Sequence, residues 1–264
     1  MQNFANKALF ICAIIILFFF FGCDDQVTDT GEENGGPNGG NEDGISFHRQ
    51  APGESARDFL TDENFSTMHI QVQYMEGYEP ETGALEDRWK AFLSETLHKS
   101  GIDIEFESIP AQGQQVYTSD EVRDLEREHR TRYNEDDTLS AYFLFLDGEY
   151  ENSNVLGIAY WNTSAAIFQQ RVEDISGGLG EPGKEVVERI ISKHEIGHLL
   201  GLVDNGTPMQ TDHHDEGRGA HCDDDECLMY YAMTRDFLGD FLLGGSVPEF
   251  DELCIEDLQA NGGR

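Results

Sequence analysis

The segment HEIGHLLG, residues 194–201, constrains the fold more than any other part of the chain. It closes a long apolar stretch with helical spacing. Two histidines four residues apart lie on one helical face, so His194 and His198 can bind one zinc ion. Glu195 beside them can accept a proton from a metal-bound water, and Gly201 can turn the chain sharply out of the helix. The fold must therefore return a third ligand to this helix.

Strand and helix patterns alternate upstream of the histidine helix. Strand patterns cover residues 68–74, 102–109, 139–146, 155–161 and 164–168, and helical spacing covers residues 85–97, 119–133 and about 184–200. Residues 139–146 are nearly continuously apolar, which is typical of a strand buried on both faces, and Ser119 is the expected N-cap of its helix. The order predicts an α+β fold with a mixed β-sheet, packed helices and a loop-rich C-terminal subdomain after the histidine helix.

The N-terminus has the features of an export signal. Lys7 precedes an apolar run at residues 8–21, which is shorter than the about 20 residues that span a bilayer; an uncleaved membrane anchor is the alternative. Gly22-Cys23 resembles a bacterial lipobox, and this resemblance implies a lipid on Cys23. We therefore expect a signal peptide at residues 1–22 and an exported lipoprotein, anchored to a membrane in the periplasm or at the cell surface.

Composition separates a tether from a folded domain. Residues 23–55 are rich in Gly, Asn, Asp and Glu, which favours a flexible tether, and residues 56–264 suffice for one domain. The formal net charge is -35, from 17 basic and 52 acidic residues. Such a surface repels a phosphate backbone, so we do not expect a nucleic-acid partner.

Three motifs resemble those of a known family. HEIGHLLG matches the first eight positions of the metzincin pattern HExxHxxGxx(H/D). Residues 221–229, HCDDDECLM, resemble the HC-x4-C-x-M segment of archaemetzincins, and residues 250–254, FDELC, resemble their F-C-x-x-C. The resemblance covers about residues 184–258. It implies a metzincin-like fold, a catalytic zinc ion, and hydrolysis of a peptide or protein substrate with Glu195 as general base.

The alternative function is a catalytically inactive surface lipoprotein that binds peptide or glycan in a metzincin-like groove. In metzincins an edge strand before the active-site helix pairs with extended substrate. The resemblance places that role on Ser164–Phe168, where we expect peptide to bind by strand addition.

The third zinc ligand has several candidates. Asp204 stands three residues after Gly201, where the family pattern has histidine or aspartate. His221 keeps the HC-x4-C-x-M context but comes 17 residues later than expected. We prefer His221 to Asp204, because imidazole is the commoner ligand, and His213 and His214 are further candidates.

The family resemblance also implies roles for residues 228–231. Met229 resembles the methionine of the turn beneath the zinc ligands, where it would form a soft apolar floor. Tyr231 stands where some metzincins have a tyrosine that approaches the metal or the oxyanion. The alternative is an aromatic side chain packed in the core.

A second, structural zinc ion is implied by the cysteine motifs. In the family four cysteines hold it, and the matching positions here are Cys222, Cys227, Asp251 and Cys254. Zinc accepts a carboxylate oxygen in such a site. A Cys222–Cys227 or Cys227–Cys254 disulfide is the alternative in an oxidising exterior.

Overall fold

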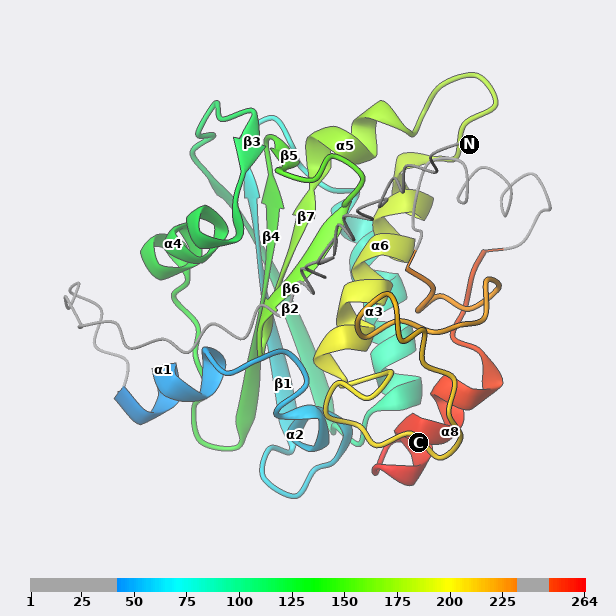
Figure 1. The fold of residues 1–264 in the computed structure, drawn as a ribbon. Coiled ribbons are helices and arrows are strands. Elements are labelled where there is room, and N and C mark those ends of the chain that lie inside the picture. The colour runs from blue at the N-terminus through cyan, green and yellow to red at the C-terminus, as the bar shows by residue number, and fades with distance from the viewer. Residues whose placement is uncertain (1–41, 232–246) are drawn as a thin grey trace, which may run out of the picture. The chain divides into compact units, whose positions relative to one another are not determined.

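Five strands form the main sheet of the computed structural model, which describes residues 42–231 and 247–264. They are β1 (Thr67–Met75), β2 (Gly101–Ile109), β4 (Thr138–Leu146), β6 (Gly157–Trp161) and β7 (Ser164–Phe168) (Figure 1). The order across the sheet is β2-β1-β4-β7-β6, and only β6 runs antiparallel to its neighbour. Two short strands, β3 (Val116–Tyr117) and β5 (Glu149–Tyr150), pair separately. The predicted mixed sheet is confirmed.

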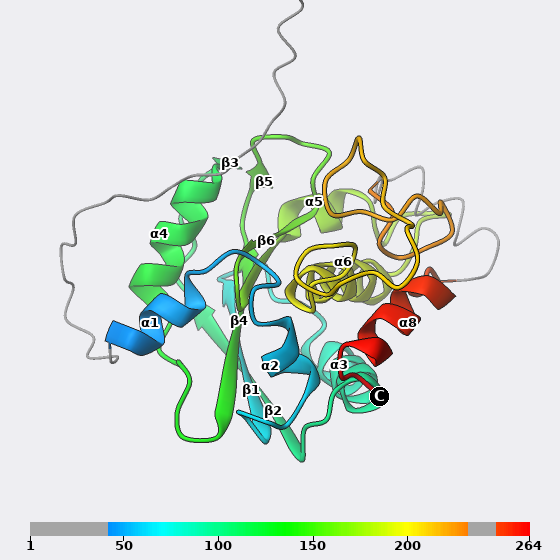
Figure 2. The same ribbon diagram turned by 60° about the horizontal axis from the view of Figure 1, so that its bottom comes forward.

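Helices cover both faces of the main sheet. The helices α3 (Thr82–Thr96) and α6 (Lys184–Leu199) lie on one face, and α4 (Ser119–His129) lies on the other (Figure 2). The remaining described helices are α1 (Glu42–His48), α2 (Ala56–Leu60), α5 (Gln169–Asp174) and α8 (Glu252–Ala260). The predicted packing of helices on the sheet is therefore confirmed.

A hydrophobic core lies on each face of the main sheet, and strand β4 supplies side chains to both, as its apolar sequence predicts. Phe143 belongs to the core that includes Trp89 of α3, whereas Leu144 belongs to the core that includes Val122 of α4. Successive side chains point to opposite faces of a strand, so a strand covered on both faces needs an apolar residue at nearly every position.

Buried polar contacts fix the histidine helix to its neighbours. The Trp89 indole N–H donates to Ser192 Oγ at 2.9 Å, which joins α3 to α6. The buried Glu188 carboxylate accepts the Glu81 backbone N–H at 2.9 Å and a second bond from the Gln169 amide. Burial raises the pKa of Glu188. These bonds hold α6 at a defined position against α3 and α5, so its last turn is fixed in space.

Helix α4 has a different cap from the one we predicted. Thr118, rather than Ser119, is the N-cap: its Oγ1 accepts the Glu121 N–H, and the Glu121 carboxylate accepts the Thr118 N–H at 2.8 Å. The two bonds satisfy two otherwise unpaired donors reciprocally, which explains why Thr118 is preferred as the cap.

Residues 42–55, which we assigned to a flexible tether, pack against the domain instead. At the end of α1, the buried His48 ring hydrogen-bonds to Thr163 Oγ1 at 2.6 Å. The Ser55 N–H donates to Asn162 Oδ1 at 2.9 Å. Polar contacts to specific partners order this segment, and composition does not report such contacts.

The predictions for residues 1–22, for Cys23 and for the rest of the tether up to residue 41 lie outside the described residues. Among the helices of residues 42–231 and 247–264, none has the length and apolar character to cross a membrane.

Candidate metal centre

The last turn of α6 presents two imidazoles to one point. His194 and His198 lie one turn apart, and their Nε2 atoms are 3.2 Å from each other. Two nitrogens bound to one tetrahedral zinc ion at 2.0–2.1 Å lie about 3.3 Å apart. The pair is therefore spaced to share one ion.

His221 completes a group of three with these histidines. Its ring centroid lies 5.3 Å from that of His194 and 5.0 Å from that of His198, and the ligand atoms of the three residues lie within 4.8 Å of one another. Asp204 is not part of this group. Of the candidates for a third ligand, the structure brings His221 to the helix.

Hydrogen bonds set which ring nitrogens face the centre. His194 Nδ1 lies 2.7 Å from the Leu228 carbonyl oxygen, and His221 Nδ1 lies 2.7 Å from that of Arg218. A carbonyl oxygen only accepts, so each Nδ1 carries the proton and each Nε2 offers its lone pair. The three residues therefore fit a divalent metal ion.

Burial also keeps these imidazoles neutral, as metal binding requires. It lowers the pKa of His194 to about 3 and holds the pKa of His198 well below its ordinary value. The pKa of His221 is lowered for the same reason. Protons therefore do not compete for the ring nitrogens of the folded protein at neutral pH.

The turn after the helix directs Asp204 into solvent. Gly201 has a φ of 74°, as predicted, and a Cβ there would lie 2.7 Å from the Thr207 nitrogen. Val203 and Asp204 follow with φ values of 57° and 59°, a conformation that costs free energy for residues with a side chain. The Asp204 side chain is exposed at the end of this turn.

Glu195 lies between the helix and strand β6. It is buried, with 4% of its surface exposed, and accepts a hydrogen bond from the Ala159 N–H. Burial raises the pKa of Glu195 to about 8. A Cβ on Gly157 would lie 2.7 Å from Glu195 Oε1 and 2.8 Å from Ile191 Cγ2. The missing side chain at residue 157 thus makes room for the carboxylate.

A cleft of about 430 Å³ lies above these groups, and β6 forms one wall. It is lined by the following residues: Pro52, Asn154, Val155, Leu156, Gly157, Ile158, Ala159, Ile191, His194, Glu195, His198, Asn205, His221 and Tyr231. The histidine group and the carboxylate therefore face a space that can admit a ligand.

The edge strand beside the cleft is β6, which corrects our prediction for Ser164–Phe168. That segment is β7, which is buried throughout because it pairs with both β4 and β6. Directly before β6, the Leu156 carbonyl accepts the Phe168 N–H at 2.9 Å, and within β6 the register shifts between Ala159 and Trp161. Alternate residues of an antiparallel strand bond to the partner, so Gly157 and Ala159 direct their backbone groups away from β7.

Met229 and Tyr231 lie below and beside the histidines. Met229 is fully buried, and a Cβ on Gly197 would lie 2.4 Å from its sulfur, so the methionine packs against the helix between the two histidines. Tyr231 is 37% exposed and lines the cleft, with the Arg218 guanidinium carbon 4.1 Å from its ring centroid. Tyr231 is therefore not a core aromatic residue.

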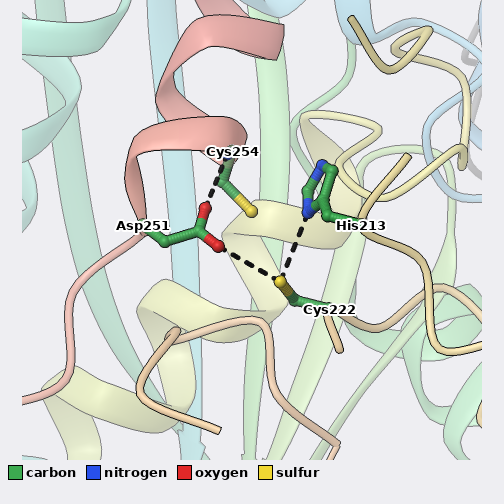
Figure 3. Close-up of side chains that lie close together, drawn as sticks. All are labelled: His213, Cys222, Asp251 and Cys254. Atoms are coloured by element: carbon green, nitrogen blue, oxygen red, sulfur yellow. Dashed lines mark hydrogen bonds between the residues drawn. The ribbon is translucent and has the colours of Figure 1, made fainter. Parts of the chain in front are cut away.

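A second group of side chains that could hold a metal ion includes Cys222, which directly follows His221. The ligand atoms of His213, Cys222, Asp251 and Cys254 lie within 4.8 Å of one another (Figure 3). Cys227 adjoins this group, with its sulfur 3.7 Å from that of Cys254. The cysteines of the described residues are free, so neither disulfide that we considered is present.

His213 is the residue of this second group that sequence reasoning missed. We named it only as a further candidate for the first ion, whereas its Nδ1 lies 3.3 Å from the Cys222 sulfur. Its neighbour His214 points elsewhere and hydrogen-bonds the Gly219 carbonyl at 2.6 Å. No pattern in the sequence indicates which of these two adjacent histidines faces the cysteines.

Comparison with known proteins identifies the fold. The structure is similar to that of archaemetzincin from Methanopyrus kandleri, with a TM-score of 0.51 and 18% sequence identity, over 74% of this chain and 96% of that one. It is also similar to metalloproteinase-II from Bacteroides fragilis, with a TM-score of 0.39 and 13% identity, over 81% of this chain and 58% of that one. The sequence matches no protein-family model and no curated protein. The archaemetzincin-like fold expected from the motifs is confirmed.

Proposed function

We propose that this chain is a zinc-dependent peptidase that hydrolyses peptide bonds in a peptide or protein substrate. One observation carries the proposal: His194, His198 and His221 direct nitrogen atoms at one point, beside the buried carboxylate of Glu195 and at the bottom of a cleft. Three nitrogen ligands with a general base beside them are the donor set that hydrolytic zinc sites use.

Each residue has a distinct task in this reaction. Zinc held by the three histidines would keep a position open for water, lower the pKa of that water towards about 7 and polarise the scissile carbonyl. Glu195 takes a proton from the attacking water and passes it to the leaving amine. The Ala159 N–H orients the carboxylate.

Substrate binds as an added strand on β6. The backbone groups of Gly157 and the carbonyl of Ala159 face the cleft and remain for an extended peptide, since the Ala159 N–H bonds to Glu195. The peptide carbonyl then lies over the three histidines. Tyr231, on the same cleft, donates a hydrogen bond to the oxygen that gains negative charge.

Zinc content and peptide hydrolysis test this proposal together. Glu195→Gln should keep the zinc ion and lose about 10²–10⁴-fold in kcat on a quenched fluorescent peptide. His221→Ala should lose the zinc ion of the histidine group, whereas Asp204→Ala should keep it. Cleavage by Glu195→Gln at the wild-type rate refutes the assignment. If the wild type binds zinc but shows no chelator-sensitive cleavage of peptides or casein, the protein is a binding protein.

The proposal has two further parts. A second zinc ion binds at the cysteine cluster, which is formed by Cys222, Cys227 and Cys254, and a lipid is attached near the N-terminus. The sequence supports lipidation through Gly22-Cys23 after the apolar run. Incorporation of labelled fatty acid should be lost in Cys23→Ser, and the protein should then leave the membrane fraction. Retention of both label and membrane association in this variant would contradict export as a lipoprotein.

A further inference from the structure

We infer that His213, oriented by Asp257, is the fourth ligand of a closed zinc site whose other ligands are Cys222, Cys227 and Cys254. Asp251 then lies outside the site as a helix cap. The inference rests on the second zinc ion of the proposed function, but it does not depend on peptidase activity.

The sulfur atoms of Cys227 and Cys254 have a spacing that suits a shared metal ion rather than a disulfide bond. Two sulfurs bound to one tetrahedral zinc ion at 2.3 Å lie about 3.8 Å apart, and Cys227 and Cys254 are separated by 3.7 Å. A disulfide bond would bring them to about 2.05 Å. Cys227 also faces two backbone N–H groups, those of Met229 at 3.3 Å and Asp251 at 3.5 Å. Such N–H groups stabilise a sulfur that carries negative charge.

His213 has the environment of a metal-binding imidazole. Its Nδ1 lies 3.3 Å from the Cys222 sulfur, close to the about 3.6 Å expected for nitrogen and sulfur on one zinc ion. Its Nε2 lies 2.9 Å from Asp257 Oδ2, and both side chains are 1% exposed. The carboxylate holds the proton on Nε2, so the lone pair on Nδ1 faces the sulfurs. This carboxylate–histidine arrangement is the one that orients metal-binding histidines.

Asp251 has another role that accounts for its position. It is the N-cap of α8, where its Oδ1 accepts the Cys254 N–H at 2.7 Å. Its Oδ2 accepts a hydrogen bond from Cys222 at 3.2 Å (Figure 3). Five side chains compete for four tetrahedral positions, and Asp251 is the one whose function does not need the metal ion.

Complete burial makes this a structural site. The three cysteines are 0% exposed and His213 is 2% exposed, so no position is open to a substrate. Closed sites with four protein ligands stabilise a fold, whereas catalytic sites keep one position for water. The zinc ion would join the loop that carries His213 to α8 at the C-terminal end of the chain.

This site would also fix the third histidine of the catalytic group. Cys222 follows His221 directly, and its N–H donates to the Met229 carbonyl at 2.9 Å. The Asp223 N–H donates to the His213 carbonyl at 2.9 Å. Binding of zinc by His213 and Cys222 therefore restrains the backbone on the side of His221 that faces away from the cleft.

Cobalt substitution of the full-length protein tests the ligand set. Thiolate-to-cobalt charge-transfer bands arise only at the cysteine cluster, because the histidine group has no sulfur ligand. We expect Asp257→Asn to weaken metal binding there by about 10–100-fold, measured by competition with a chelator. His213→Ala should weaken it further, and Asp251→Asn, which keeps the helix cap, should resemble the wild type.

His213→Cys gives an independent result if the alanine variant does not fold. It should retain the metal, and its charge-transfer intensity should rise by about one third as three thiolates become four. An unchanged intensity would overturn the inference. Loss of metal from Asp251→Asn with retention in His213→Ala would also overturn it. The same holds if the wild type lacks the charge-transfer band and has only one free thiol among Cys222, Cys227 and Cys254, because two of them would then form a disulfide.

The peptidase proposal can fail without affecting this result. His198→Ala removes a ligand of the catalytic group only, so it should abolish peptide hydrolysis and leave the thiolate-to-cobalt bands in place. Bands without any peptidase activity in the wild type would support the His213 site and refute the proposed function.

Discussion

Replacement of Gly157 by alanine should separate catalysis from metal binding. The added Cβ would lie 2.7 Å from Glu195 Oε1, 3.0 Å from Glu195 Cγ and 2.8 Å from Ile191 Cγ2. Ile191 is buried and cannot retreat freely, so the glutamate must move. The three atoms nearest to the new methyl group all belong to Glu195 and Ile191, and none belongs to a histidine.

The size of the effect follows from this overlap. Carbon atoms in contact are separated by about 3.5 Å, so the carboxylate must move by about 0.5–0.8 Å. Displacement of a catalytic group by about 1 Å costs about 10²-fold in rate. We therefore expect kcat of Gly157→Ala to fall roughly 10²-fold. Overpacking costs about 1–3 kcal/mol, partly offset by the less flexible unfolded chain, which leaves a loss of about 1–2 kcal/mol in the free energy of unfolding.

The assay compares kcat on a quenched peptide, zinc content and thermal unfolding for three variants. Gly101→Ala is the matched control, because Gly101 also lies in a strand and a Cβ there would be 3.8 Å from its nearest neighbour, Thr67 Cγ2. This control should have wild-type kcat. Glu195→Gln sets the lower limit of kcat, because it lacks the proposed general base. A folded Gly157→Ala with full zinc content and wild-type kcat refutes the placement of Glu195 as the base beside β6.

Three further predictions concern the same helix and turn. Gly197→Ala should destabilise the fold by about 1–3 kcal/mol, because its Cβ would overlap the Met229 sulfur, and unchanged thermal unfolding would contradict this packing. Asp204→Gly should raise the free energy of unfolding in urea denaturation by at most about 1 kcal/mol with zinc content unchanged, since the φ of 59° no longer carries a penalty while the unfolded chain becomes more flexible; a loss of more than about 1 kcal/mol would show that the side chain has a role. In the metal-free protein, folded Glu195 keeps its proton up to about pH 8, whereas the unfolded chain releases it near pH 4.5. The stability of the wild type relative to Glu195→Gln should therefore fall as the pH rises from 4.5 to 8, by up to about 5 kcal/mol, and a difference independent of pH would refute the burial of this carboxylate.

The sequence predicted the elements of the fold well because their patterns are local. The apolar run at residues 139–146 identified the central strand, and the histidine helix begins at Lys184 as predicted. The position of each strand across the sheet is not a local property. Residues 157–161 and 164–168 are both short and apolar, so the sequence could not show which of the two lies at the edge.

Helix spacing alone predicted only two of the candidate metal-binding residues, whereas His221 and the three cysteines were predicted from the family resemblance. His194 and His198 come together because one turn separates them, but the return of His221 depends on the path of a loop. His213 acquires its orientation from Asp257, which is 44 residues away in the chain. Contacts over such a separation leave no periodic pattern in the sequence.

If a peptide adds to β6 as proposed, the open edge of this strand determines the conformation that the substrate must adopt. A helix or a paired strand already uses its own backbone N–H and C=O groups and has none to offer Gly157 and Ala159. The register shift after Ala159 also keeps the accessible edge short, which limits pairing with an intact sheet of another molecule. Chain segments that are already unfolded, such as termini, linkers and fragments of degraded proteins, would enter this cleft, and compact domains would be spared.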